Sequence, residues 1–226
     1  MSNSKKYLCE LNPDNYYHIY NRANGKDKLF LSERNRHHFL NTYSLYLSDF
    51  VETHTYCLIP NHFHFLVRVR SESHILKKAK PNYDKYLKKN NNSETIICDL
   101  LSEVLRRFFI AYSKAFNKEQ NRHGNLFERP FKRILIDNDD YFTQVIYYIH
   151  SNPENHKIIN SFKNYKWSSY NSFLSENPTR LQRDSVLDWF GGKEGFIKSH
   201  SMYQECKDMD KFMIEDENDY FETKKT

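Results

Sequence analysis

The sequence has little glycine and proline, and this scarcity excludes several classes of protein. Its 226 residues include 5 glycines and 6 prolines, too few for a collagen-like or low-complexity chain. No apolar run is long enough to cross a membrane, and residues 1–15 lack the apolar core of a secretory signal. We therefore expect a cytoplasmic protein with no membrane partner.

The cysteines are too scattered to form a metal cluster or a disulfide framework. No two of them make a CxxC pair, and all four stand far apart: Cys9, Cys57, Cys98 and Cys206. This spacing is typical of reduced, structural thiols. The sequence therefore predicts neither a zinc cluster nor disulfide bonds.

The net charge of +5 is small but unevenly distributed. Residues 205–226 contain eight acids and four bases, a net charge of −4, so the preceding residues carry +9. A basic body with an acidic tail fits a polyanionic partner such as DNA, and hence a nucleoid-associated protein. From charge alone, a mildly basic surface without such a partner is an equally good interpretation.

Aromatic residues make up 16% of the chain and can supply a core. Alternation of apolar residues predicts strands at 16–22, 55–70 and 129–137. Helices are expected from about Ser32, from Asp99, and from Asn138 or Asp139, where a side chain can cap the first turn.

Two prolines refine this pattern. Pro60 is expected to divide 55–70 into a hairpin near Asn61, and Pro153 to end the third helix near Asn152. The order of elements predicts an α+β fold, a mainly antiparallel sheet with helices packed on it.

The expected organisation has one main domain with polar additions. We expect a lead-in at 1–14, a main domain at 15–175 with a polar, loop-like insertion near 71–97, a helical extension at 176–204 and an acidic tail at 205–226.

The strand after Pro60 concentrates polar side chains on one face. Because strand side chains alternate, the core face carries Phe63, Phe65, Val67 and Val69, and the other carries His62, His64, Leu66, Arg68 and Arg70. Two histidines two residues apart can hold one metal ion, and the arginines suit a polyanion. For an isolated His-x-His, a solvated sheet face is the more common explanation.

The third helix offers the groups that such a metal site needs. Tyr148 and Asn152 share one helical face, because they are four residues apart. The Asn152 amide can be a third ligand for Mg²⁺ or Mn²⁺, and the Tyr148 phenol can attack a phosphodiester beside the ion. Tyr147 is the weaker candidate, since it lies on another face.

Several blocks of the sequence together resemble the single-tyrosine HUH transposases. In chain order these are YHIYNR, YCLIPNHFHFLV, NLFERPFKRILI, YYIHSNP and YKWSSY, between about Tyr16 and Phe173. The resemblance implies a ferredoxin-like sheet and a divalent metal held by two histidines and a helix side chain. It also implies a 5′-phosphotyrosyl link to single-stranded DNA, often beside a hairpin.

Matched to the family's motifs, Tyr148 is the expected nucleophile, and His62, His64 and Asn152 are the expected metal ligands. Lys132 matches a lysine expected to contact DNA. The other basic residues expected at the DNA are Arg22, Arg68, Arg70 and Arg133. Two departures concern DNA contacts: the glycine usual before the RFK block is absent, and NPENHK stands in place of NPVRAG.

The expected function is DNA transposition, or processing of palindromic repeats, by nicking and rejoining single strands. One alternative is a resident DNA-binding protein of the same fold that no longer transposes. Another is a metallohydrolase that uses water and forms no covalent link to DNA. The resemblance leaves monomer and homodimer open.

Overall fold

A four-stranded antiparallel sheet forms the centre of the protein. The computed structural model describes residues 9–87, 93–128 and 130–205. The strands are β1 (Tyr16–Arg22), β2 (Val51–Ile59), β3 (His62–Val69) and β4 (Lys132–Ile136). Their order across the sheet is β2-β3-β1-β4, and every neighbouring pair is antiparallel.

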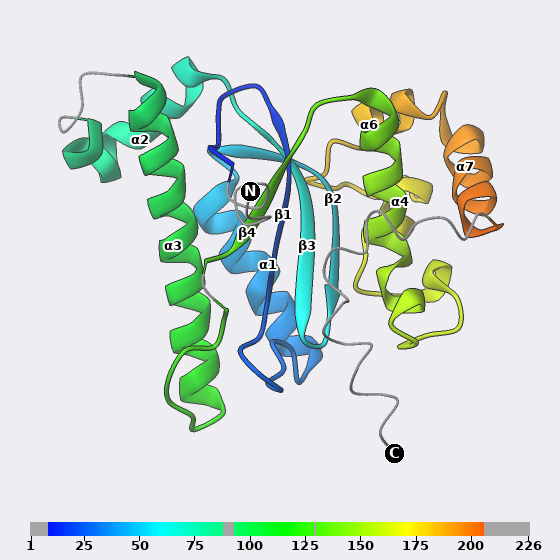
Figure 1. Ribbon diagram of the computed structural model, residues 1–226, viewed down its shortest axis with the longest axis horizontal. Coiled ribbons are helices and arrows are strands. Elements are labelled where there is room, and N and C mark those ends of the chain that lie inside the picture. The colour runs from blue at the N-terminus through cyan, green and yellow to red at the C-terminus, as the bar shows by residue number, and fades with distance from the viewer. Residues whose placement is uncertain (1–8, 88–92, 129, 206–226) are drawn as a thin grey trace, which may run out of the picture.

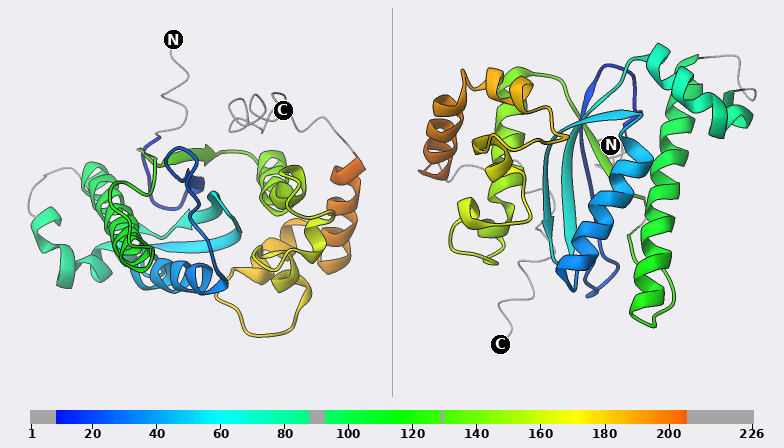
Figure 2. Two further views of the ribbon diagram at one scale, coloured as in Figure 1. Left: turned by 90° about the horizontal axis from the view of Figure 1, so that it is seen from below. Right: turned by 180° about the vertical axis from the view of Figure 1, so that it is seen from behind.

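Helices cover both faces of this sheet. They are α1 (Glu33–Leu47), α2 (Glu72–Leu87), α3 (Ser93–Glu119), α4 (Asp139–Asn155), the 3-10 helix η2 (Phe162–Asn164), α5 (Tyr170–Leu174), α6 (Arg183–Trp189) and α7 (Lys193–Glu205). Helices α1 and α3 lie on one side of the sheet and α4 on the other (Figures 1 and 2). This arrangement confirms the predicted α+β fold. None of the described helices could span a membrane.

Aromatic side chains fill the core between the sheet and the helices α1 and α3. Phe39 of α1 lies at its centre, with ring centroids about 5 Å from those of Phe30, Phe63, Phe108 and Tyr112. Such large rings each bury much apolar surface. The high aromatic content thus supplies the core, as the composition indicated.

Local capping and turn signals were predicted correctly. Ser32 caps α1, with its hydroxyl accepting from the Asn35 backbone N–H while the Asn35 side chain accepts from the Ser32 N–H. The chain turns at Pro60 and Asn61, which separate β2 from β3. Among the described cysteines, Cys9, Cys57 and Cys98 are free thiols.

The prediction that the polar stretch near 71–97 is loop-like was wrong for residues 72–87 and from Ser93 onward, whereas residues 88–92 lie outside the described residues. The structure has α2 from Glu72, and α3 begins at Ser93, six residues before the predicted cap at Asp99. The lysines of this stretch concealed a helical stripe in which Ile75 and Ala79 are buried four residues apart, and Tyr83 is buried at a kink where the backbone leaves helical geometry. Apolar periodicity decides helix formation here, despite the polar composition.

The predicted end of the third helix near Asn152 was also wrong, because α4 continues through Pro153 to Asn155. A proline lacks an N–H and its ring crowds the carbonyl four residues back, but near the end of a helix few further hydrogen bonds depend on it. The His156 backbone N–H still donates to the Asn152 carbonyl at 3.0 Å. Asn152 is therefore held rigidly inside the helix.

The remaining element predictions were close. β4 covers the central part of the predicted 129–137 strand, and α6 and α7 occupy the predicted helical extension. Most of the lead-in (1–8) and nearly all of the acidic tail (206–226) lie outside the described residues.

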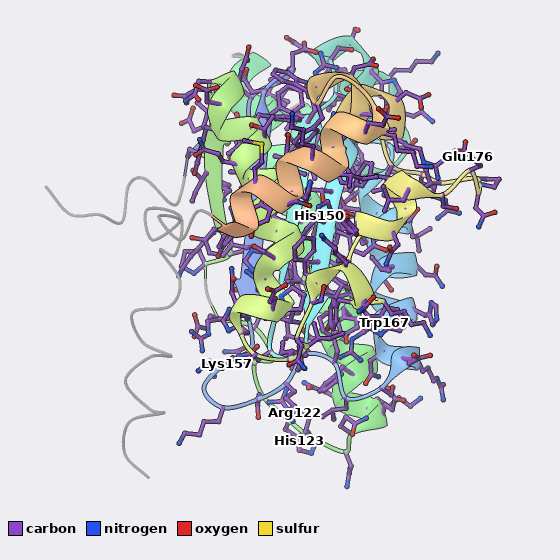
Figure 3. All side chains as sticks on the ribbon, turned by 90° about the vertical axis from the view of Figure 1, so that its right-hand side faces the viewer. Arg122, His123, His150, Lys157, Trp167 and Glu176 are labelled. Carbon is purple, nitrogen blue, oxygen red and sulfur yellow. The ribbon has the colours of Figure 1, made fainter. Side chains whose placement is uncertain are left out.

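A chain of buried hydrogen bonds ties α4 to its neighbours. His150 of α4 lies beneath α7 (Figure 3), with Nδ1 2.9 Å from Nε2 of His200. Its Nε2 is 2.7 Å from the Thr55 hydroxyl of β2 and 2.8 Å from the Ser169 hydroxyl. His200 Nδ1 is 2.8 Å from the Phe196 carbonyl oxygen.

The Phe196 carbonyl, at one end of these hydrogen bonds, fixes which nitrogen of His200 and of His150 carries the proton. The Phe196 oxygen can only accept, so His200 carries its proton on Nδ1. His200 Nε2 then accepts from His150 Nδ1–H, and His150 Nε2 accepts from a hydroxyl. Both imidazoles are neutral in this arrangement, and burial lowers the pKa of each.

We expect His200→Ala to lower the free energy of unfolding by about 2–4 kcal/mol, because it leaves a buried donor on His150 and a cavity. Met202→Ala, on the same helix with Met202 56% exposed, is the matched control. Chemical denaturation measures both. Equal stabilities of the two variants would contradict the role given to His200.

Stability should also fall on acidification. Burial lowers the pKa of His200 from 6.5 to about 4, so the unfolded chain binds the proton first. The stabilisation is complete above pH 6.5 and is lost as the pH falls toward 4, by about 3 kcal/mol at that point. His200→Gln should show a shallower decline over this range in denaturation at several pH values, whereas parallel curves would contradict the assignment.

Candidate catalytic and metal-binding site

The two motif histidines lie on the face of the sheet that α4 covers. In β3 the side chains alternate, so Phe63 and Phe65 enter the aromatic core while His62 and His64 point the other way. Both histidines are buried. The sequence prediction of the two strand faces at this point is confirmed.

Tyr148 and Asn152 of α4 meet these histidines. The Asn152 Oδ1 is 3.0 Å from His62 Nε2, and the Tyr148 ring centroid is 5.5 Å from that of His64. Both residues are buried, with Tyr148 only 4% exposed. One chain thus brings together all four residues that sequence reasoning selected for catalysis and metal binding.

His62 lies between two amide oxygens, and its buried ring is neutral. Its Nδ1 is 3.0 Å from Asn61 Oδ1, and its Nε2 is 3.0 Å from Asn152 Oδ1. Burial, and then the charge of His156, lower the pKa of His62 well below 6.5, so the ring is neutral and has one N–H. One of its nitrogens therefore directs a lone pair at an oxygen.

His64 has a histidine partner of its own on β1. His64 Nδ1 is 3.0 Å from His18 Nε2, and burial lowers the pKa of both rings, that of His18 to about 3. If His64 donates from Nδ1, its Nε2 lone pair is available to a metal ion. Ligating histidines are commonly oriented by such a partner at the other nitrogen.

The donor set fits a divalent cation. Neighbouring ligands of an octahedral ion, each bound at about 2.1 Å, lie about 3 Å apart, which is the distance between His62 Nε2 and Asn152 Oδ1. The described residues include no group of three or more His, Cys, Asp or Glu side chains suited to an ion. The Asn152 amide would therefore complete a set formed with His62 and His64.

Tyr147, the rival to Tyr148, faces away from the histidines of the sheet. Its ring lies 5.9 Å from Phe162 and 5.7 Å from His200. The expectation that the two neighbouring tyrosines occupy different faces of the helix is confirmed.

Two of the basic residues predicted to contact DNA lie on the same face as His62 and His64. Arg22 pairs with His62 in the register of the sheet and forms an ion pair with Glu128 at 3.5 Å. Lys132 is opposite Tyr20, with its Nζ 5.6 Å from the Tyr20 ring.

The other three predicted DNA contacts are not brought to this site. Arg68 lies six residues along β3 from His62, about 20 Å away at the rise of a strand. Arg68 and Arg70 both form ion pairs with Glu52. Arg133 lies on the opposite face of the sheet, where its guanidinium contacts the Phe131 ring at 5.0 Å. Strand length and alternation separate these arginines from the histidines.

Sequence reasoning missed three aromatic neighbours of the site. His18 and Tyr20 of β1 stack beside His64, with centroids at 5.2 and 5.9 Å. His156 follows Asn152 by four residues and contacts His62, with centroids 4.7 Å apart. Alternation in YHIYNR already placed His18 and Tyr20 on one face, but only the pairing of β1 with β3 shows which face that is.

Comparison with known proteins gives one informative similarity. No family model and no curated protein matches the sequence. Among solved structures, the chain is similar to a REP-associated tyrosine transposase bound to a REP hairpin, with a TM-score of 0.52 and 13% identity. The match covers 79% of this chain and 89% of that chain. The chain therefore has the fold of a tyrosine transposase, the fold that its motifs implied.

Proposed function

We propose that the protein nicks and rejoins single-stranded DNA, with Tyr148 as nucleophile. The observation that carries the proposal is the meeting of α4 with β3, which places Tyr148 and Asn152 against His64 and His62. Buried polar groups are costly unless they are paired. A phenol, two neutral imidazoles and an amide in one cluster therefore fit phosphodiester chemistry better than they fit packing.

The reaction proceeds by exchange of one phosphodiester for another. The Tyr148 phenol gives up its proton as its oxygen attacks the phosphorus, the bond from phosphorus to the 3′ oxygen breaks, and the 3′ oxygen leaves and takes up a proton. The product is a 5′-phosphotyrosine, which conserves the energy of the broken bond. Attack by a 3′-hydroxyl then rejoins the strand and releases Tyr148.

The proposed cofactor is Mg²⁺ or Mn²⁺, held by His62, His64 and Asn152. When bound, such an ion withdraws charge from the phosphodiester oxygens and favours the phenolate, whose free pKa is about 10. His18 would orient His64 by accepting its Nδ1–H.

The proposed substrate is single-stranded DNA with a hairpin or palindrome, as in transposition. Arg22 and Lys132 lie on the same face of the sheet as His62 and His64, and their positive charges would attract the DNA phosphates. The solved structure of the same fold is itself bound to a hairpin. Tyr148 and the histidines are buried, so side chains around them must move for the DNA to reach them.

We expect Tyr148→Phe to abolish the covalent protein–DNA adduct, because the variant lacks the attacking oxygen, while DNA binding is retained. Single strands from the flanks of the gene, labelled and run on a denaturing gel with Mg²⁺, measure the adduct. Tyr147→Phe is the matched control and should form the adduct normally. An adduct formed by Tyr148→Phe would refute the assignment, and cleavage without any adduct would favour a water-using metallohydrolase.

We also expect His62→Ala and His64→Ala to reduce cleavage by at least about 100-fold, because each removes a metal ligand. EDTA should have the same effect on the unmodified protein, and added Mn²⁺ should reverse it. His123→Ala, which alters an exposed loop histidine, is the control. Full cleavage in EDTA would exclude a metal role.

A further inference from the structure

A large cavity lies on the opposite side of the sheet from Tyr148. It has a volume of about 700 Å³ and is enclosed by α3 and by the segment that leads from α3 to β4. Figure 1 shows this segment returning along α3 toward the sheet. The volume falls within the range of roughly 300–1,000 Å³ typical of small-ligand sites.

Aromatic rings form one wall of this cavity. Phe109 of α3 lies between Phe127 and Phe131, with centroids 5.0 and 5.5 Å from theirs. Phe109 and Phe131 are only half-buried, although both line the cavity. Each thus leaves apolar ring surface available for stacking.

The rim of the cavity is basic. Lys114 lines it and is exposed. Arg106 also lines it, and Arg106 and Arg107 share the single carboxylate of Glu103, so this trio keeps one positive charge. Arg133 does not line the cavity; its guanidinium lies 5.0 Å from the Phe131 ring and donates to the Cys9 carbonyl. Stackable rings with cations beside them are the features by which proteins bind single-stranded nucleic acid.

Glu128 contacts both the cavity and the face of the sheet that carries His62 and His64. Asn21 lines the cavity and donates its side-chain N–H to the Glu128 carbonyl at 3.2 Å. The Glu128 side chain, another cavity residue, forms an ion pair with Arg22, the register partner of His62. Glu128 thus links Arg22, on the face of the sheet that carries His62, to the cavity on the other face.

From these features we infer that the cavity binds one unpaired nucleobase of the DNA strand, stacked on Phe109 or Phe131, with neighbouring phosphates at Lys114 and Arg106. The inference rests on the proposed DNA substrate. It gives the protein a second contact with the strand, separate from the reacting phosphate.

Photochemical cross-linking tests this site directly. The full chain is irradiated with a random-sequence pool of single-stranded DNA in which iodouracil replaces thymine, and cross-linked peptides are identified by mass spectrometry. We expect cross-links at Phe109 or Phe131. Ser113→Trp should fill the cavity, which Ser113 lines, and should lower that yield about tenfold. Ser113→Ala is the matched control, and thermal denaturation confirms that both variants fold.

Cross-links confined to the α4 side of the sheet, or a yield unchanged by Ser113→Trp, would overturn the inference. The Tyr148 adduct, measured on the same variants, separates the two proposals. A normal adduct without cavity cross-links refutes only the base-binding site. Cavity cross-links without an adduct refute the nicking reaction and leave the base-binding site standing.

Discussion

The docking of α4 on the sheet is the contact on which the candidate site depends. His150 of this helix is held by β2, by Ser169 and by α7 through a buried chain of hydrogen bonds with one direction of donation. Tyr148 and Asn152 stand two residues to either side of it. Because a helix is rigid over one turn, fixing the rotation of His150 also fixes the direction of both functional side chains.

Burial gives this site its chemical character as well as its shape. It lowers the pKa values of His18, His62 and His64, so these rings are neutral and offer lone pairs. The same burial makes acid destabilising, since protonated imidazoles favour the unfolded chain. The proposed metal site and the acid-sensitive fold would thus have one physical cause.

Strand β1 connects the two surfaces that we assign to DNA. His18, Tyr20 and Arg22 point toward α4, while Asn21 points toward the cavity beside α3. Alternation of side chains along one strand therefore puts the two proposed DNA contacts, that of the reacting phosphate and that of the stacked base, on opposite sides of the same sheet. Glu128, which contacts both Asn21 and Arg22, links the two surfaces at the end of β1.

The sequence by itself located the strands approximately, identified the cap at Ser32, narrowed the cap of α4 to Asn138 or Asp139, and selected His62, His64, Tyr148 and Asn152, because these depend on local periodicity and motif spacing. It misjudged α2, where lysines concealed an apolar stripe, and the end of α4, where few further hydrogen bonds depend on a late proline. Strand pairing alone decided that His18 orients His64 and that Arg133 faces away. Such contacts join residues far apart in the chain, and no local pattern encodes them.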